Sequence, residues 1–362
     1  MSYFAAHRRA LLDSQKANNA FTILVDTTRA GSANNTMQLP IRGTNMVIDW
    51  GDGFVQTVTQ DALPISTNWV TRVYASPGNY QIRIGGGLNW IRFNNTGDRL
   101  KLMQIRNWGS TVWASLEQSF WGCSNMTGVF TDTPNLSNVT HTNDMFNGAT
   151  LFNSPIGNWN MGNITHIGGM LAATRFNQPI SEWNVGNVVN MQYVFWNNTF
   201  FNQNIGAWNT QSVTTMAWMF QGATAFNQNI GTWNTQSVTA MNNMFQGATA
   251  FNQNIGTWNT GNVVNMEGAF WNAQSFNQPI GVWNVSKVTN MHLMFHSAFA
   301  FNHPLMWNTG NVINMNNMFT NAIVFNQNLS TWCVWRIATL PTGFDVGATA
   351  WVLPRPIWGT CP

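Results

Sequence analysis

The residues that could do acid–base or nucleophilic chemistry are few in this 362-residue chain, and they form no catalytic motif. The histidines include His141, His166, His292 and His303, and there is neither an HExxH metal-binding motif nor a GxSxG nucleophile motif. The few acidic residues never recur as a pair at the spacing of two catalytic carboxylates. The sequence therefore predicts a protein that is not an enzyme, with no catalytic residues, no metal site and no cofactor.

The three cysteines are the next candidates for chemistry. Cys333 and Cys361 fall on adjacent copies of the repeat described below. We therefore predict that they lie within bonding reach and form a disulfide in an oxidising environment. Cys123 lies in a Gly-Cys-Ser turn with no evident base, which favours a buried, unreactive thiol.

Large aromatic residues are the candidates for partner binding. Trp196, Trp218, Trp271 and Tyr193 stand at positions where other copies of the repeat carry Gln, Asn or Thr. A ring at a position that tolerates small polar residues is predicted to be at least half exposed. A patch of such rings, edged by amides, suits stacking on sugars or packing against another subunit. The alternative is that the rings cover gaps between neighbouring elements.

A repeat of about 25 residues positions these side chains. A Phe-Asn pair marks each copy, and in most copies a tryptophan follows the phenylalanine by seven residues. The marker residues are Phe152, Phe176, Phe201, Phe226, Phe251, Phe276, Phe301 and Phe325. Self-similarity at a fixed short period predicts copies that stack and bury their apolar faces on their neighbours, which is a solenoid.

Each copy is expected to hold a short strand, a turn and a helix of two or three turns, so the predicted fold class is α+β. Val213, Met216, Met219 and Phe220 recur at i, i+3, i+6 and i+7, the spacing of one helical face. The asparagine after each marker phenylalanine is expected to hydrogen-bond to the next copy, and a second asparagine series after the tryptophans is expected to do the same.

The last copy, in residues 333–362, is degenerate and is predicted to cap the stack. Phe344 follows Phe319 by 25 residues, as the repeat requires. Prolines at 341, 354, 356 and 362 make this copy a poor template for further stacking. Residues 109–332 then form the regular part of the repeat domain.

Residues 19–108 have a different pattern, of short alternating apolar runs separated by Gly, Pro, Asn and Asp. This pattern predicts a small antiparallel β-sandwich. Asp49 and Asp52 could be part of a calcium loop, but a Gly-Asp-Gly turn between strands explains them without an ion.

Residues 1–18 are predicted to form a basic, amphipathic arm that attaches the protein to an assembly. Its apolar residues Phe4, Leu11 and Leu12 alternate with Arg8 and Arg9. A short helix of this kind is marginal alone, so the arm is expected to dock on the body or on a neighbouring molecule.

The composition excludes two classes of partner. Charged residues make up only 7% of the chain, and residues 108–332 contain two cations, Arg175 and Lys287. A nucleic-acid groove needs several clustered cations, so nucleic acid is not an expected partner. No apolar run approaches the ~18 residues of a membrane helix, so membrane insertion is not expected either.

The repeat unit FNQxIxxWNTxxVTxMxxMFxGAxx resembles that of BspA-like bacterial surface proteins, which is of the leucine-rich-repeat type. The segments Ile48–Gly53 and Pro77–Ile82 resemble the WGDG and PG-x-Y-x-I signatures of polycystic-kidney-disease-type (PKD) domains. Together with a short basic arm, this arrangement is similar to that of virion-surface proteins of tailed phages.

The resemblance implies a non-enzymatic structural or adhesive protein on a phage particle: a fibre, a spike or a capsid decoration. Its expected partners are other virion proteins, copies of itself and a host-surface glycan or protein. Such a protein assembles in the host cytoplasm and needs no leader peptide. The alternative is a secreted adhesin on a bacterial cell surface.

Overall fold

The computed structural model describes residues 19–59 and 69–362. The chain divides into two compact units, Met1–Ile164 and Thr165–Pro362. The predicted attachment arm, with Phe4, Arg8, Arg9, Leu11 and Leu12, lies outside the described residues.

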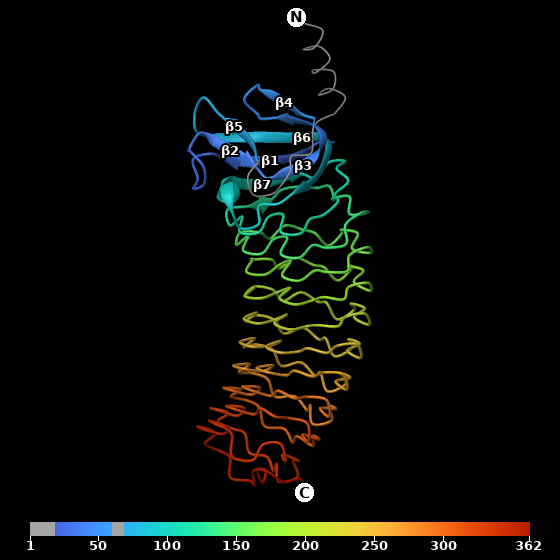
Figure 1. Ribbon diagram of the computed structural model, residues 1–362, viewed down its shortest axis with the longest axis vertical. Helices are drawn as coiled ribbons and strands as arrows, with labels where there is room; N and C mark the ends of the chain where they lie inside the picture. The colour runs from blue at the N-terminus through green and yellow to red at the C-terminus, as the bar shows by residue number, and fades with distance from the viewer. Residues whose placement is uncertain (1–18, 60–68) are drawn as a thin grey trace, which may run out of the picture. The chain divides into compact units, whose positions relative to one another are not determined.

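Strands β1 to β7 lie in the part of the chain where short alternating runs predicted them. The bounds are β1 (Phe21–Asp26), β2 (Thr36–Leu39), β3 (Ile41–Asp49), β4 (Val55–Val58), β5 (Val70–Val73), β6 (Asn79–Ile91), η1 (Gly97–Lys101, a 3-10 helix), β7 (Leu102–Asn107) and β8 (Thr127–Gly128). Six strands form a sheet in the order β4-β3-β6-β1-β7-β8, and β2 pairs with β5 in a second sheet. Figure 1 shows β1, β3, β6 and β7 beside one another.

Alternation of buried and part-exposed residues explains how the large sheet forms. On β1, Phe21, Ile23 and Val25 are fully buried, and Ile23 pairs with Ile82 on β6. One face of the sheet is thereby covered by β-branched and aromatic side chains, which strands favour. All pairings are antiparallel except β7 with β8, which is parallel.

The buried charged pair Lys101 and Asp98, both in η1, holds the loop that precedes β2 against η1. Lys101 Nζ lies 3.6 Å from Asp98 Oδ1 and donates to the carbonyls of Ser32, Ala33 and Thr36 at 3.0, 3.0 and 2.8 Å. Asp98 in turn accepts from the N–H and hydroxyl of Ser32. Neither charged side chain is exposed, and a buried pair is tolerated only with such additional hydrogen bonds.

The copies of the second unit consist of successive three-residue turns. Around Phe220, the N–H of Met219 donates to the carbonyl of Met216, and the N–H of Gln221 donates to the carbonyl of Trp218, both at 3.2 Å. Each such bond closes a turn on the third residue back, so no i to i−4 helix ladder forms.

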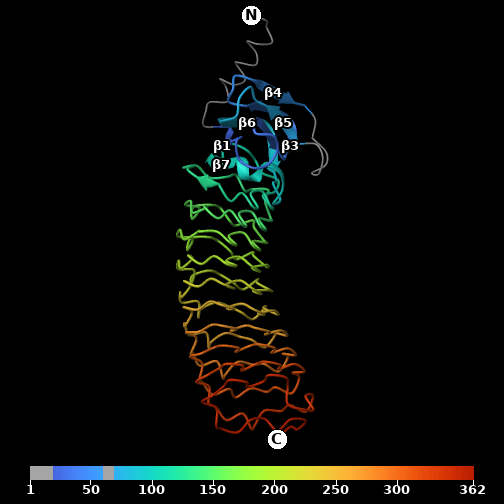
Figure 2. The same cartoon turned by 90° about the vertical axis from the view of Figure 1, so that its left-hand side faces the viewer.

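The N–H groups of every second residue in this segment instead donate hydrogen bonds to the next copy. Trp218, Phe220 and Gly222 donate to carbonyls 24 residues further on, at 2.9, 2.9 and 2.7 Å. Single parallel bridges at another point of the copy also join neighbours, as from Thr215 to Ala240. Figure 2 shows the resulting tiers of the second unit following one another in chain order, from green to red.

The predicted α+β fold class is therefore wrong, and so is the leucine-rich-repeat-like solenoid with a helix in each rung. No α-helix occurs among the described residues. Trp218 (φ 56°) and Gly222 (φ 68°) are both left-handed, and a left-handed residue interrupts a right-handed helix. Consecutive three-residue turns repeat their apolar positions at i, i+3 and i+6, so the sequence pattern imitates a helical face.

The core of the second unit is built from columns of stacked rings. Trp208 and Trp233 stack with ring centroids 6.3 Å apart and planes 3° apart, and Phe220 and Phe245 stack at 5.6 Å. The buried indole of Trp233 donates its Nε1 proton to the carbonyl of Ile205 (3.0 Å), so that its polar group is satisfied. A cavity of about 10 Å³ interrupts the packing beside Ala269, where neighbouring copies carry methionine.

The two asparagine series have different roles. Asn202 Oδ1 accepts from the N–H of Asn227 (2.9 Å) and from the side chain of Gln228 (3.0 Å), which is the predicted bond between copies. The second series bonds within its own copy, as where Asn209 accepts from the N–H of Gln211 (3.2 Å). The first series thus joins copies, whereas the second holds a turn.

Candidate functional site

Two of the predicted partner-binding residues occupy one left-handed position of the repeat. Tyr193 has φ 60° and Trp218 has φ 56°, and each N–H donates to a carbonyl of the next copy. The equivalent residues in other copies are Gln118, Asp144, Gly169, Asn243, Gly268, Leu293 and Asn317. Bulky residues are uncommon in this conformation, because their Cβ approaches the backbone closely. The backbone ladder fixes the position, and its side chain is free to differ from copy to copy.

Tyr193, Trp196 and Trp218 contact one another and are called the aromatic cluster below. The rings of Tyr193 and Trp218 stack at 4.9 Å with planes 10° apart, and Trp196 meets Tyr193 edge-on at 6.5 Å. Tyr193 is exposed, and burial raises the pKa of its hydroxyl, so the phenol is neutral at pH 7.

Trp271 belongs to a second group of side chains. It meets His296 at 5.7 Å, and its described ring contacts do not include the aromatic cluster. In the same two copies, Glu267 accepts a hydrogen bond from the side chain of Asn290 (2.9 Å) and lies 3.4 Å from Nδ1 of His292. Burial lowers the pKa of His296, so this ring is neutral at pH 7.

Sequence reasoning named Trp271 but missed the neighbouring polar residues Glu267, His292 and His296 as site residues. The available signal was the position of Glu267 and His292, which are 25 residues apart and therefore occupy the same place in consecutive copies.

The expected exposure of the tryptophans needs correction. Trp196, Trp218 and Trp271 are only part-exposed, and none reaches the predicted half exposure. Stacking along the column of copies covers part of Trp218, because Tyr193 lies on one of its faces. The surface open to a partner therefore includes the exposed part of Tyr193 and portions of the two tryptophans.

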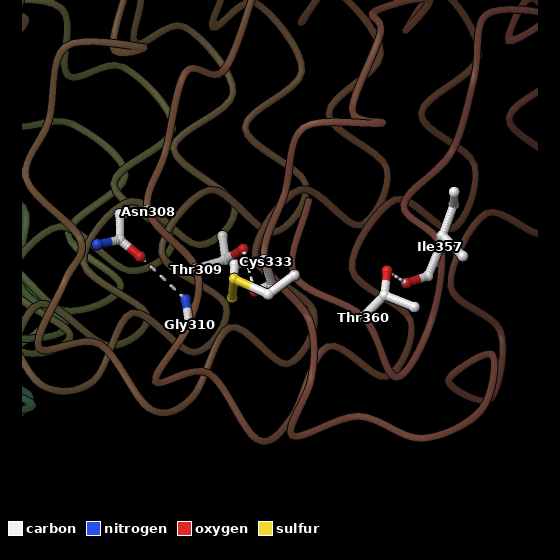
Figure 3. Close-up of a disulfide and its surroundings, with 7 residues drawn as sticks. Asn308, Thr309, Gly310, Cys333, Ile357 and Thr360 are labelled. Atoms are coloured by element: carbon white, nitrogen blue, oxygen red, sulfur yellow. Dashed lines mark hydrogen bonds between the residues drawn. A yellow bond between two sulfur atoms is a disulfide. The ribbon is translucent and has the colours of Figure 1, made fainter.

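Cys333 and Cys361 are joined by a disulfide that closes a loop across 28 residues (Figure 3). Thr309 donates its hydroxyl proton to the carbonyl of Cys333 at 2.8 Å, which ties this loop to the preceding copy. Next to Cys361, the N–H of Val334 donates to the carbonyl of Thr360 at 2.8 Å.

The remaining candidates have structural partners. Cys123 is fully buried, and burial raises the pKa of its thiol far above the usual value, so it does not form a reactive thiolate. Asp49 is paired with Arg83 (3.2 Å) and Asp52 with Arg72 (2.6 Å). Residues 19–59 and 69–362 contain no group of three or more His, Cys, Asp or Glu side chains that could hold a metal ion.

No helix in the described part of the chain has both the length and the apolar character needed to cross a membrane.

Comparison with known proteins identifies one family. The family described as "Mycoplasma protein of unknown function, DUF285" matches residues 114–229, 194–306 and 250–350. These overlapping matches cover more than half of the chain, so the protein belongs to this family. No curated protein and no solved structure matches.

The resemblance drawn from the repeat unit is therefore corrected. The family is DUF285 and not the BspA-like leucine-rich-repeat proteins, whose helices these turns lack. No comparison supports a PKD-like domain or a phage protein. The family match covers only the repeats, and the family's description assigns it no function.

Proposed function

We propose that the protein is a non-enzymatic structural and adhesive protein whose repeats present the aromatic cluster to a partner. The aromatic cluster carries this proposal. At its left-handed position other copies have Gly, Asn, Asp, Gln or Leu, so the repeat does not require a large ring there. Tyr193 and Trp218 nevertheless place two stacked rings there, and Tyr193 is exposed. Aromatic rings with a polar group are the side chains most used to bind sugars and protein surfaces.

The chemistry of the surrounding surface suits an uncharged partner. Within the repeats, Arg175 and Lys287 are the only cations between residues 108 and 332, and amides of Asn and Gln recur in every copy. A glycan or an uncharged protein surface fits such a face, whereas a nucleic acid does not.

The disulfide supports a location outside a reducing compartment, because disulfides persist in oxidising environments. The location we propose is the surface of a virus particle, and the alternative is a bacterial cell surface. Neighbouring capsid and tail genes would support the first, and neighbouring export and anchor genes would support the second.

Binding is tested with purified protein on an array of glycans and on surface proteins of candidate host cells. Tyr193→Ala combined with Trp196→Ala should abolish binding while changing the melting temperature by less than about 3 °C, as for surface substitutions. As a control, Trp233→Ala removes a buried ring and should cost about 3–5 kcal/mol of stability.

A large loss of stability in the Tyr193/Trp196 variant, with binding per folded molecule unchanged, would assign the aromatic cluster to the core and reject the proposal.

A further inference from the structure

Two arginines of the first unit contact the same tryptophan ring. Arg42 on β3 pairs in register with Trp90 on β6, and Arg92 follows Trp90 by two residues. Ile91 between them is fully buried, so Trp90 and Arg92 lie on the opposite, part-exposed face of the sheet. The guanidinium carbons of Arg42 and Arg92 lie 4.5 and 5.5 Å from the centre of the Trp90 ring. These three side chains are called the arginine–tryptophan group below.

Arg92 is held in place by an uncharged acceptor. Its Nε (3.0 Å) and its Nη2 both donate to the side-chain oxygen of Gln118. The Gln118 side chain also hydrogen-bonds to the carboxylate of Asp144. The amide nitrogen of Gln118 therefore serves Asp144 and its oxygen serves Arg92, because an amide oxygen cannot donate. This arrangement fixes the position of the Arg92 guanidinium and leaves its charge without a neutralising partner.

The described carboxylates of the first unit do not pair with the arginine–tryptophan group. Asp26, Asp49, Asp52 and Asp98 pair with other cations. Neither Arg42 nor Arg92 belongs to any of the described ion pairs, and Glu117, next to Gln118 in the chain, belongs to none either. A negative charge for this group must therefore come from outside the described residues.

Two donors of the group also lack an acceptor. Nε of Arg42 and the indole Nε1 of Trp90 are shielded from solvent, and neither donates a hydrogen bond to any described residue. Buried donors in folded proteins are nearly always hydrogen-bonded, and two like charges beside one ring repel each other. A stack that served only to cover Trp90 would not need two charged side chains or leave donors without partners. The group thus lacks both acceptors and negative charge, and an oxyanion supplies both.

We propose that Arg42, Trp90 and Arg92 bind an oxyanion group of a ligand, which is a carboxylate, a sulfate or a phosphate. A guanidinium presents N–H groups in a fixed fork that matches two oxygens of such a group. The three side chains are part-exposed, so a ligand can approach them from solvent. A rotation of the Arg42 side chain turns its Nε toward the ligand, and changes of this kind are common on binding.

The size of the group restricts the ligand to a single anionic group. A surface that follows a nucleic-acid backbone needs several clustered cations, and here there are two. The site is separate from the proposed function, because the aromatic cluster belongs to the second unit and suits an uncharged partner.

Nuclear magnetic resonance of the full chain, labelled with ¹⁵N, tests the inference. Sodium acetate, sodium sulfate and sodium phosphate are added in separate titrations at low ionic strength. The signals of the Arg42 Nε–H and the Trp90 Nε1–H should shift together and saturate with one Kd, on the order of 1 mM, for at least one of the anions. Acetate probes a planar carboxylate, whereas sulfate and phosphate probe a tetrahedral oxyanion.

Variants separate this site from the general charge of the unit. Arg42→Gln removes one guanidinium and should raise the Kd about tenfold or more, as read from the Trp90 signal. Arg42→Lys keeps the charge without the planar fork and should recover only part of the affinity. The matched control is Arg106→Gln, because Arg106 also donates to a glutamine, Gln104, and belongs to no described ion pair. The control should leave the Kd unchanged.

Three results would overturn the proposal. Shifts that rise linearly with concentration for all three anions would show that no site exists. A Kd changed equally by Arg42→Gln and Arg106→Gln would show only a general effect of charge. Asp13 and Asp61 lie outside the described residues, and anion binding that appears only in Asp13→Asn or Asp61→Asn would mean that a carboxylate of the chain itself fills the site. A failure of the aromatic cluster to bind would leave each of these results unaffected.

Discussion

At the scale of single residues, the left-handed positions show how one backbone conformation selects its side chains. Asn243 and Asn317 take φ values of 55° and 56° there, and Asp144 takes 53° in an equivalent place. Asn and Asp tolerate this conformation better than other residues with a Cβ. Asp144, however, brings a carboxylate into a part-buried turn, and burial raises its pKa above 3.8 despite a hydrogen bond from Asn147 at 2.9 Å.

We predict that Asp144→Asn stabilises the protein at neutral pH. A raised pKa means that the folded state holds the proton more tightly than the unfolded state. Wild-type stability therefore falls as pH rises from below 3.8 through the folded pKa, and it stays lower above that range. The variant lacks this loss. Its free energy of unfolding should exceed that of the wild type by about 0.5 kcal/mol at pH 7 and should equal it below pH 3. Thermal unfolding at both pH values measures the difference, and a gain of equal size at both would contradict the electrostatic cause.

At the scale of elements, the period of the repeat could be predicted from the sequence, but the conformation of each copy could not. Phe220 and Phe245 are 25 residues apart and stack, as a fixed period with almost no insertions requires. The spacing of Val213, Met216 and Met219 is common to a helix and to three-residue turns, so it could not distinguish them. The discriminating signal was Gly and Asn at one column, in Gly169, Asn243, Gly268 and Asn317, which indicates a left-handed position.

The same limit applies to the candidate site. The sequence could show that Trp218 replaces small polar residues of other copies. It could not show that Tyr193 covers one of its faces, because this depends on the left-handed backbone of both residues.

The copy in residues 333–362 is held by a covalent bond as well as by packing, because Cys333 and Cys361 are joined within it. We predict that Cys361→Ser lowers the free energy needed to unfold this copy by about 3 kcal/mol, which is the chain-entropy value for a loop of 28 residues. The amide of Val334, which donates to the carbonyl of Thr360, should exchange about a hundredfold faster. The amide of Phe245, in an interior copy, is the internal control and should not change, because each copy is stabilised mainly by its neighbours. An unchanged rate at Val334 would show that packing alone holds the copy.

At the scale of the whole molecule, most of the described stabilising contacts are between uncharged groups. Charged residues are 7% of the chain, and 225 residues of the repeats (108–332) hold two cations and five acids. Backbone ladders, amide bonds and stacked rings replace the ion pairs that other surfaces carry. Among the described ion pairs, the one between Lys101 and Asp98 has both side chains fully buried and is therefore shielded from salt.

This composition predicts that both stability and partner binding are nearly independent of ionic strength. Surface charges are screened over about 10 Å at 0.1 M salt and about 3 Å at 1 M, so a charge-driven complex weakens steeply between these concentrations. A complex formed through Tyr193, Trp196 and Trp218 should instead change its Kd by less than about twofold from 0.05 to 0.5 M NaCl, and apolar contacts do not weaken in this range. Measuring the Kd of the partner identified on the array across this range gives the answer directly. A fall in affinity of tenfold or more would show that the few charges, and not the aromatic cluster, make the contact. The attachment region would then have to be sought among the 11 cations of residues 1–107.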